Sequence, residues 1–270
     1  MLDLLGRDDV DVAAGHVLGQ SKYWAADGLF PSDAHSWTLD LYDAVAAVCQ
    51  GTSSHPLRWL GIGPMTDLAY LLGADATHRY PLGLATRLRI MQMGGALHYR
   101  DPRRAEHNFR LDPGAVDEVL SRAEHVALVM SDHTFTPVIA IDADSPIYRL
   151  LAASPTPWAQ LLIAHLDQWF SRFHPASMLH DPLALSAAVD LPFVTFQHRE
   201  FRLEPDARMF VGPGYVAKLT TGVDYTGFLD WVHLTLRDGK PARPPGRECS
   251  LDCLTSLASE SLRPAPPTQS

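Results

Sequence analysis

Short apolar runs that end in glycine alternate with amphipathic segments, and this alternation constrains the fold more than any other feature. Residues 57–62 form one such run and stop at Gly63, and residues 88–93 form a second that stops at Gly94. A third run covers residues 125–130. Continuous apolar runs are typical of strands that are buried on both faces of a parallel sheet. The sequence therefore predicts an α/β fold, with a mostly parallel central sheet and helices on both faces.

A capping residue followed by proline marks three expected helix starts, at Asp112, Ser145 and Thr156. Such residues accept bonds from the first backbone N–H groups, and proline suits the first helical position. Further helices are expected at residues 37–50 behind Ser36, at residues 66–72 before Gly73, and from Asp224 onward. The first of these would bury Leu41, Ala44, Val45 and Val48. Two more strands are expected, residues 193–203 as an edge strand or hairpin arm and residues 215–220.

The composition changes near residue 238. We expect residues 1–237 to form one domain and residues 238–270 to form a Pro-rich, disordered tail with one short helix at residues 251–257. The tail holds Cys249 and Cys253, and two cysteines without a nearby histidine do not complete a zinc site.

Charge and hydropathy exclude several classes of protein. The net charge of −9 argues against nucleic acid and an anionic membrane as partners. No run of about 18 apolar residues is present to span a bilayer. The first residues lack a basic stretch and a long apolar stretch, so we expect no secretory signal. Three cysteines do not form a complete set of disulfides, which favours a reducing cytoplasm.

Polar residues that follow the predicted strands are the candidates for chemistry, since ligands of such sheets bind at the carboxyl ends of the strands. His180 beside Asp181 has the chemistry of a general acid near neutral pH. Glu106 and Asn108, two residues apart, can hold vicinal hydroxyls. Each feature also has a structural explanation, as a helix cap, a turn or a solvated loop. Asp112 is expected to be a cap only.

Four segments in combination resemble the nucleoside hydrolase family, of the inosine- and uridine-preferring type. They are Gly63-Pro64-Met65-Thr66-Asp67, Met93-Gly94-Gly95, Ala105-Glu106-His107-Asn108 with Asp112-Pro113, and His180-Asp181-Pro182-Leu183-Ala184. The resemblance covers most of residues 1–236 and implies a Rossmann-like sheet. It also implies an enzyme of purine and pyrimidine salvage that hydrolyses the N-glycosidic bond of ribonucleosides to base and ribose. A calcium cofactor and a homodimer or homotetramer are expected on the same ground.

The resemblance also implies roles for individual residues. His180 matches the acid that protonates the leaving base, and Met93, Glu106 and Asn108 match residues that contact the ribose. Asp181 and the backbone carbonyl of Ile62 match calcium ligands. Calcium accepts carboxylate, carbonyl and hydroxyl oxygens, so this set is chemically coherent.

Two features of the sequence depart from the family pattern. The family's N-terminal strand, with its Asp-x-Asp-x-x-x-Asp-Asp calcium motif, has no counterpart here. Three alternatives follow: a chain that lacks its N-terminal strand unit, a hydrolase-like binding or regulatory module, or an N-glycosidase with a rearranged site. Arg100 replaces a neutral asparagine near the ribose, as expected for an acidic substrate or for a decayed site.

Overall fold

The computed structural model describes residues 1–7, 9–19, 23, 25–29, 40–51 and 56–239. The predicted tail, its short helix and its two cysteines lie outside the described residues, apart from residues 238 and 239. The division at residue 238 therefore stays a prediction. Within the described part of the chain, no helix has the length and apolar character needed to cross a bilayer.

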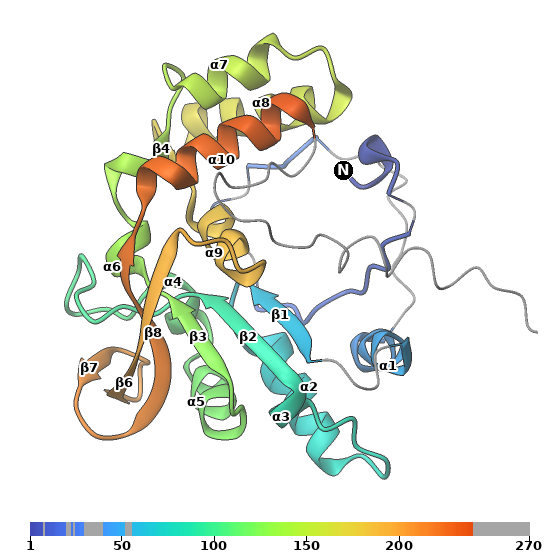
Figure 1. Ribbon diagram of the computed structural model, residues 1–270, viewed down its shortest axis with the longest axis vertical. Coiled ribbons are helices and arrows are strands. Elements are labelled where there is room, and N and C mark those ends of the chain that lie inside the picture. Colours follow the sequence, from blue (N-terminus) through green and yellow to red (C-terminus); the bar gives the residue numbers. More distant parts are fainter. Residues whose placement is uncertain (8, 20–22, 24, 30–39, 52–55, 240–270) are drawn as a thin grey trace, which may run out of the picture.

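A six-stranded sheet lies at the centre of the fold, in the order β1-β2-β3-β8-β6-β7 (Figure 1). The strands are β1 (Leu57–Gly61), β2 (Leu88–Met93), β3 (Val126–Val129), β6 (Val194–Leu203), β7 (Met209–Val211) and β8 (Tyr215–Val223). The first four in spatial order are parallel, whereas β6 runs antiparallel to both β8 and β7. The predicted mostly parallel sheet is confirmed. A separate small sheet pairs β4 (Ala140–Ile141) with β5 (Ser177–Met178).

Helices cover both faces of the sheet, as the alternating pattern predicts. One face packs against α1 (Leu41–Gly51), α2 (Thr66–Thr77), α3 (Leu84–Arg87) and α5 (Pro113–Arg122). The other packs against α7 (Pro146–Ala153), α8 (Pro157–Arg172), α9 (His180–Ala188) and α10 (Tyr225–Asp238). Short helices α4 (His107–Leu111) and α6 (Ser131–Thr134) lie near the carboxyl ends of the strands, and 3₁₀ turns cover Asp3–Leu5 and Pro137–Ile139.

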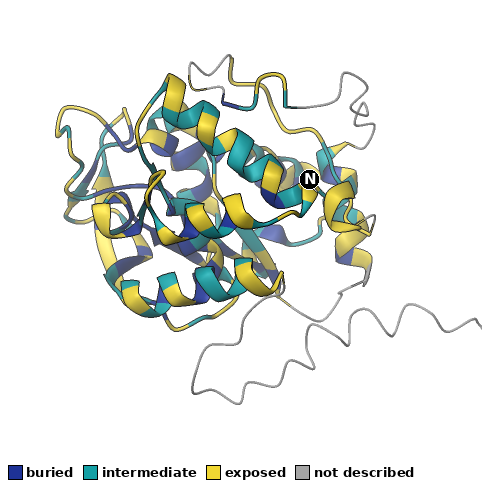
Figure 2. Cartoon of the chain, turned by 90° about the horizontal axis from the view of Figure 1, so that it is seen from above, coloured by how far each residue is buried: buried dark blue, intermediate teal, exposed yellow. Residues whose placement is uncertain are grey.

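The core consists of two apolar clusters separated by the sheet. Neighbouring residues of a strand point to opposite faces, so Leu128 joins one cluster and Val129 the other. Figure 2 shows the helices with their buried residues facing inward and their exposed residues facing outward. Continuous apolar strands are thus explained by burial on two sides.

Three predicted helix starts are confirmed by their capping bonds. The side chain of Asp112 accepts a bond from Ala115 N (3.1 Å), and Ser145 and Asp224 cap α7 and α10 in the same way. Thr156 precedes α8 but makes no side-chain capping bond. The segment predicted as an edge strand or hairpin arm is the hairpin arm, because β6 lies between β8 and β7.

Two helix predictions are wrong in detail. The helix predicted to stop at Gly73 continues to Thr77, since Asp75 in its last turn is buried and accepts bonds from Leu82 N (2.5 Å) and Leu84 N (2.8 Å). Those tertiary bonds outweigh the cost of about 1 kcal/mol for a glycine inside a helix.

The buried face of α1 differs in part from the prediction, although Leu41 and Val45 pack against the core as expected. Tyr42 and Cys49 are buried, whereas Val48 is 54% exposed. Tyr42 donates its hydroxyl to Asp75 (3.0 Å), which turns this side of α1 toward α2. The predicted start of the helix, with Ser36 as its cap, lies outside the described residues.

Candidate active site

The carboxyl ends of the first three parallel strands lie beside α4, α6 and α9 (Figure 1). Helix α9 packs against β1 and β2, and α6 packs against α9. The residues that follow β1 and β2 and those that begin α9 therefore come to one end of the sheet. The predicted site residues lie at this end.

Asn108 links Met93 and Glu106 through hydrogen bonds. Asn108 Nδ2 donates to the Met93 carbonyl (3.0 Å), and Gly95 N donates to Glu106 Oε2 (3.2 Å). Glu106 also caps α4, because Asn108 N (2.9 Å) and Phe109 N (3.3 Å) donate to the same oxygen. The glutamate and the asparagine are thus fixed against the end of β2, and both are buried.

Burial sets the ionisation of Glu106. Removal from water raises the pKa of its carboxyl group, and the backbone N–H bonds oppose that rise. A buried carboxylate without a cation partner is costly unless a ligand compensates it. Its second oxygen, Oε1, has no hydrogen bond to the described residues, which leaves it available to a hydroxyl donor.

His180 begins α9 and lies against the segment that follows β3. Its Nδ1 lies 2.7 Å from Thr134 Oγ1, and its ring stacks on Phe135 with the centroids 5.9 Å apart. Burial, with smaller contributions from Arg100 and His107, lowers the pKa of His180 to about 4. The imidazole is therefore neutral at pH 7 in the free protein. His107, which lies between Glu106 and Asn108 in the sequence, is one of the groups that lower the pKa of His180.

Asp181 follows in the first turn of α9, although it is not the cap of that helix. Burial raises the pKa of its carboxyl group to about 6, and no hydrogen bond or ion pair joins it to the described residues. The Ile62 side chain is 50% exposed just beyond β1, against which α9 packs. Asp181 and the Ile62 carbonyl are the two predicted metal ligands.

These two ligands alone do not fit calcium. The ion takes about six to eight oxygen ligands. The described residues contain no group of three or more His, Cys, Asp or Glu side chains arranged to hold a metal. The unpartnered carboxylate of Asp181 is a suitable oxygen donor, but the rest of a calcium site is missing from the described part of the chain.

The turn after β1 has mainly structural contacts. Gln92 Nε2 donates to Gly63 O (2.7 Å), and a Cβ at Gly61 would collide with Gln92 Oε1. Thr66 Oγ1 donates to Asp112 Oδ2 (2.7 Å), which ties the starts of α2 and α5 together. The turn is therefore held to the neighbouring strand and helix.

Sequence reasoning missed three residues of this site. Thr134 and Phe135 contact His180, and the buried Gln92 Oε1 has no hydrogen-bond partner among the described residues. A polar residue inside the apolar run at 88–93 was a signal for Gln92. Nothing in the local sequence pointed to Thr134, because its contact joins residues 46 positions apart.

The fold and the site define a class of protein, an α/β enzyme whose ligand binds at the carboxyl ends of parallel strands. A family model described as inosine-uridine preferring nucleoside hydrolase matches residues 1–231. The chain therefore belongs to this family and is an N-glycosidase that hydrolyses ribonucleosides. Enzymes of this family generally depend on a metal ion. The predicted family is confirmed, and a hydrolase is favoured over a binding or regulatory module.

Solved structures of nucleoside hydrolases share the fold. A plant nucleoside hydrolase is 21% identical with a TM-score of 0.69, and the match covers 90% of this chain and 84% of the other. The purine-preferring ribonucleoside hydrolase from Gardnerella vaginalis is 21% identical with a TM-score of 0.68, over 88% of this chain and 83% of the other. The inosine-uridine preferring enzyme from Bacillus anthracis is 19% identical with a TM-score of 0.57, over 76% and 67%. A search among curated protein sequences finds no significant match.

Proposed function

We propose that a ribonucleoside binds between the end of β2 and the starts of α4 and α9. Glu106 and Asn108 hold ribose hydroxyls, and Met93 lines the ribose site. The observation that carries this assignment is the buried Glu106 carboxylate, fixed at Oε2 by Gly95 N and two N–H groups of α4. A carboxylate fixed in this way is suited to accept a bond from a sugar hydroxyl.

The reaction breaks the bond between C1′ of ribose and a nitrogen of the base. Water adds its oxygen to C1′, and the base leaves with a proton on nitrogen. The sugar gains positive charge as the bond breaks, and a nearby carboxylate stabilises that charge. Glu106 supplies such a carboxylate.

His180 is proposed as the acid that protonates the leaving base. Its neutral state in the free protein requires the ring to gain a proton as substrate binds, because a neutral imidazole is a poor acid. Thr134 holds Nδ1, so Nε2 is the nitrogen that can face the base.

The remaining expectations stay predictions. Calcium would bind Asp181 and the Ile62 carbonyl together with oxygens from outside this pair. A role in nucleoside salvage, a cytoplasmic location and a homodimer or homotetramer are implied by the resemblance. The protein is expected to act on small nucleosides, with no nucleic acid or membrane partner.

Ribose release from a panel of purine and pyrimidine nucleosides tests the proposal, with added calcium and with a chelator. We expect release, and its loss with the chelator would support metal dependence. Asn108→Ala should raise KM, because it removes a ribose contact. A folded preparation that releases no ribose from any nucleoside would contradict the proposal.

The acid role of His180 has a separate test. His180→Ala should lower kcat for inosine by about 100-fold or more. It should leave kcat for 4-nitrophenyl riboside almost unchanged, because nitrophenolate leaves without a proton. His165→Ala, on the exposed side of α8, is the control and should affect neither substrate. Equal losses on both substrates would show that His180 is only structural.

A further inference from the structure

Gln92 is a polar residue on an otherwise apolar face of β2. Its side chain is 1% exposed, and it lies on the same face of the strand as Leu88 and Ile90, which belong to the apolar cluster on the side of α2 and α5. An amide group in such surroundings destabilises the fold unless it is hydrogen-bonded. The bonds that Gln92 makes therefore indicate its role.

Both bonds of the Gln92 amide nitrogen lie at the carboxyl ends of β1 and β2. Nε2 donates to Gly63 O (2.7 Å) in the turn after β1 and to Met93 O (2.8 Å) at the end of β2. The last backbone pair between these two strands joins Gly61 to Gln92. Both carbonyls lie beyond that pair, so the side chain of Gln92 continues the connection after the backbone pairing has ended.

The Met93 carbonyl connects Gln92 to Asn108. Asn108 Nδ2 donates to the same oxygen (3.0 Å), and a carbonyl oxygen has two lone pairs, which the two amides use. Asn108 Nδ2 also lies 3.4 Å from Met93 Sδ. Because an amide group is planar, with its oxygen and nitrogen on opposite sides, these contacts turn Asn108 Oδ1 away from β2. Oδ1 is the acceptor atom of this amide.

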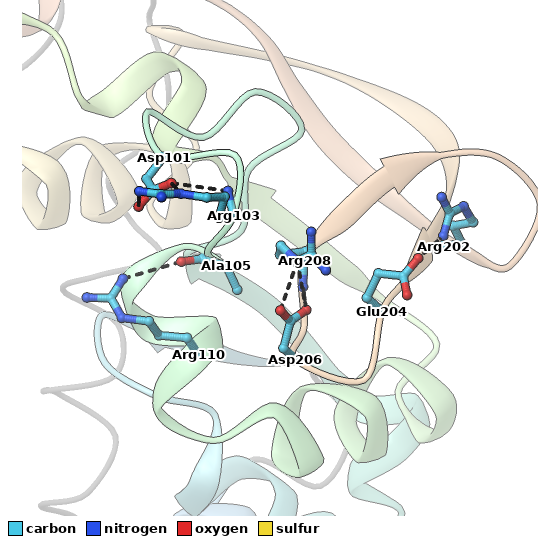
Figure 3. A network of polar contacts seen from close by, with 8 residues as sticks. All are labelled: Asp101, Arg103, Ala105, Arg110, Arg202, Glu204, Asp206 and Arg208. Carbon is cyan, nitrogen blue, oxygen red and sulfur yellow. Dashed lines mark hydrogen bonds and ion pairs between the residues drawn. The ribbon is translucent and has the colours of Figure 1, made fainter.

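The other contacts of α4 do not set this orientation. Figure 3 shows Arg110 donating to Ala105 O (3.3 Å), a bond between α4 and the residues just before it. Phe109 is buried in the apolar cluster, and apolar contact has no preferred direction. The bond from Asn108 to the Met93 carbonyl is directional and joins α4 to β2, so it decides how the asparagine amide is turned.

The oxygen of the Gln92 amide is costly to the fold. Oε1 is buried and has no hydrogen-bond partner among the described residues. It lies over Gly61, where a Cβ would collide with it. Leucine or methionine at position 92 would avoid this buried oxygen and would suit the apolar cluster, as do the two residues that share the face. Such an amide is explained if its nitrogen acts at the site.

We propose that Gln92 is a positioning residue of the active site, which orients Asn108 through the Met93 carbonyl. The inference rests on the proposed function, in which Asn108 contacts the ribose. Gln92 is buried and acts through its neighbours. Its Nε2 ties the Met93 carbonyl to the turn after β1, so the oxygen that Asn108 binds stays in place. Without this tie the oxygen is free to move, and Asn108 loses its fixed orientation.

A nuclear magnetic resonance experiment tests this role without any substrate, because Asn108 is the only asparagine in the sequence. An isotope label on the side-chain nitrogen of asparagine gives one pair of amide signals, which reports Asn108. Gln92→Met keeps the length of the side chain but has no N–H group. We expect the Asn108 amide protons of this variant to exchange with water at least about fivefold faster.

Gln168→Met is the matched control for this experiment. Gln168 lies on α8, and its Oε1 is also buried without a partner among the described residues. The control should leave the exchange of the Asn108 amide protons unchanged. Unchanged exchange in Gln92→Met, or equal acceleration in the two variants, would overturn the proposal.

A second variant keeps the Gln92 amide and displaces it. The methyl group of Gly61→Ala would collide with Gln92 Oε1, so the amide must move, and we expect the same faster exchange at Asn108. Gly73→Ala is the matched control, because the nearest atom to an added Cβ there, Glu118 Oε1, is 3.9 Å away. If Gln92→Met does not fold, unchanged exchange in Gly61→Ala overturns the proposal.

Kinetics show whether Gln92 acts through Asn108. We expect Gln92→Met to raise KM for inosine at least about fivefold with a smaller change in kcat, and to raise it no further when combined with Asn108→Ala. A merely structural effect would add in full to that of Asn108→Ala, and such additivity would overturn the proposal. If the unmodified protein hydrolyses no nucleoside, the proposed function is wrong, and the exchange of the Asn108 protons decides the role of Gln92 by itself.

Discussion

Asp181 shows what burial does to a single carboxyl group that has no partner in the described part of the chain. Burial raises its pKa from the ordinary 3.8 to about 6, and no described residue donates a hydrogen bond to it. A carboxylic acid whose pKa is higher in the folded state costs stability once the pH rises above its unfolded value. The cost begins near pH 4 and is complete above pH 6. Residues kept at such a cost are common at binding sites.

Asp181→Asn should therefore stabilise the protein at pH 7.5 in the presence of a chelator. The expected gain in the free energy of unfolding is up to about 3 kcal/mol. This value follows from the rise in pKa from 3.8 to about 6, at about 1.4 kcal/mol per pKa unit. At pH 3.5 the two proteins should unfold nearly alike, because the Asp181 carboxyl group is mostly neutral in both the folded and the unfolded state. Thermal unfolding at the two pH values measures this difference. Asp144→Asn, at an exposed carboxylate, is the control, and a loss of stability in Asp181→Asn at pH 7.5 would contradict the argument.

At the scale of elements, one capping side chain holds the starts of two helices together. Asp112 accepts from Ala115 N at the start of α5 and from Thr66 Oγ1 at the start of α2. The sequence predicted the first contact from the aspartate before proline. It could not predict the second, because Thr66 lies 46 residues away.

Asp112→Ala should lower the free energy of unfolding by about 2 kcal/mol, since a cap and a second hydrogen bond are lost together. Urea denaturation measures the change. Thr156→Ala is the matched control, because Thr156 also precedes a helix-starting proline but makes no capping bond. We expect a loss below about 0.5 kcal/mol there. Equal losses in the two variants would show that the bonds of Asp112 contribute little.

At the scale of the molecule, the N-terminal segment connects helices from opposite faces of the sheet, on the side of β1 (Figure 1). His16 N donates to Asp67 Oδ1 of α2 (2.8 Å), and Gln168 Nε2 of α8 donates to Asp27 O (3.0 Å). Strand β1 is the edge of the sheet in the described part of the chain. The segment therefore contacts α2 on one face of the sheet and α8 on the other, next to the edge strand β1.

Asp67→Ala should release the first of these contacts. Amide hydrogen exchange at residues 14–18 should become faster, because Asp67 Oδ1 accepts from the backbone and from the ring of His16. The loss in stability should be about 1 kcal/mol or less, as both side chains are partly exposed. Asp43→Ala, at an exposed residue of α1, should leave this exchange unchanged. Unchanged exchange in Asp67→Ala would show that the segment is held by other contacts.

Much of the fold could be predicted because it depends on local patterns. The apolar run at 88–93 becomes β2 with the same bounds. A strand buried on both faces can be recognised from its own residues, without knowing which strands pair with it. The end of α2 could not be predicted, because it depends on what Asp75 contacts. The same holds for α1, whose buried face follows the bond from Tyr42 to that aspartate.

The sequence by itself determined the class of fold, the family and the identity of the residues that follow the strands. These follow from periodicity, capping and motif order, which are properties of neighbouring residues. Only the tertiary structure decided that Asn108 binds Met93, that Glu106 binds Gly95, and that Thr134 holds His180. Such contacts join segments far apart in the chain, and burial, which sets the pKa of His180 and Asp181, exists only once the sheet and its helices have packed.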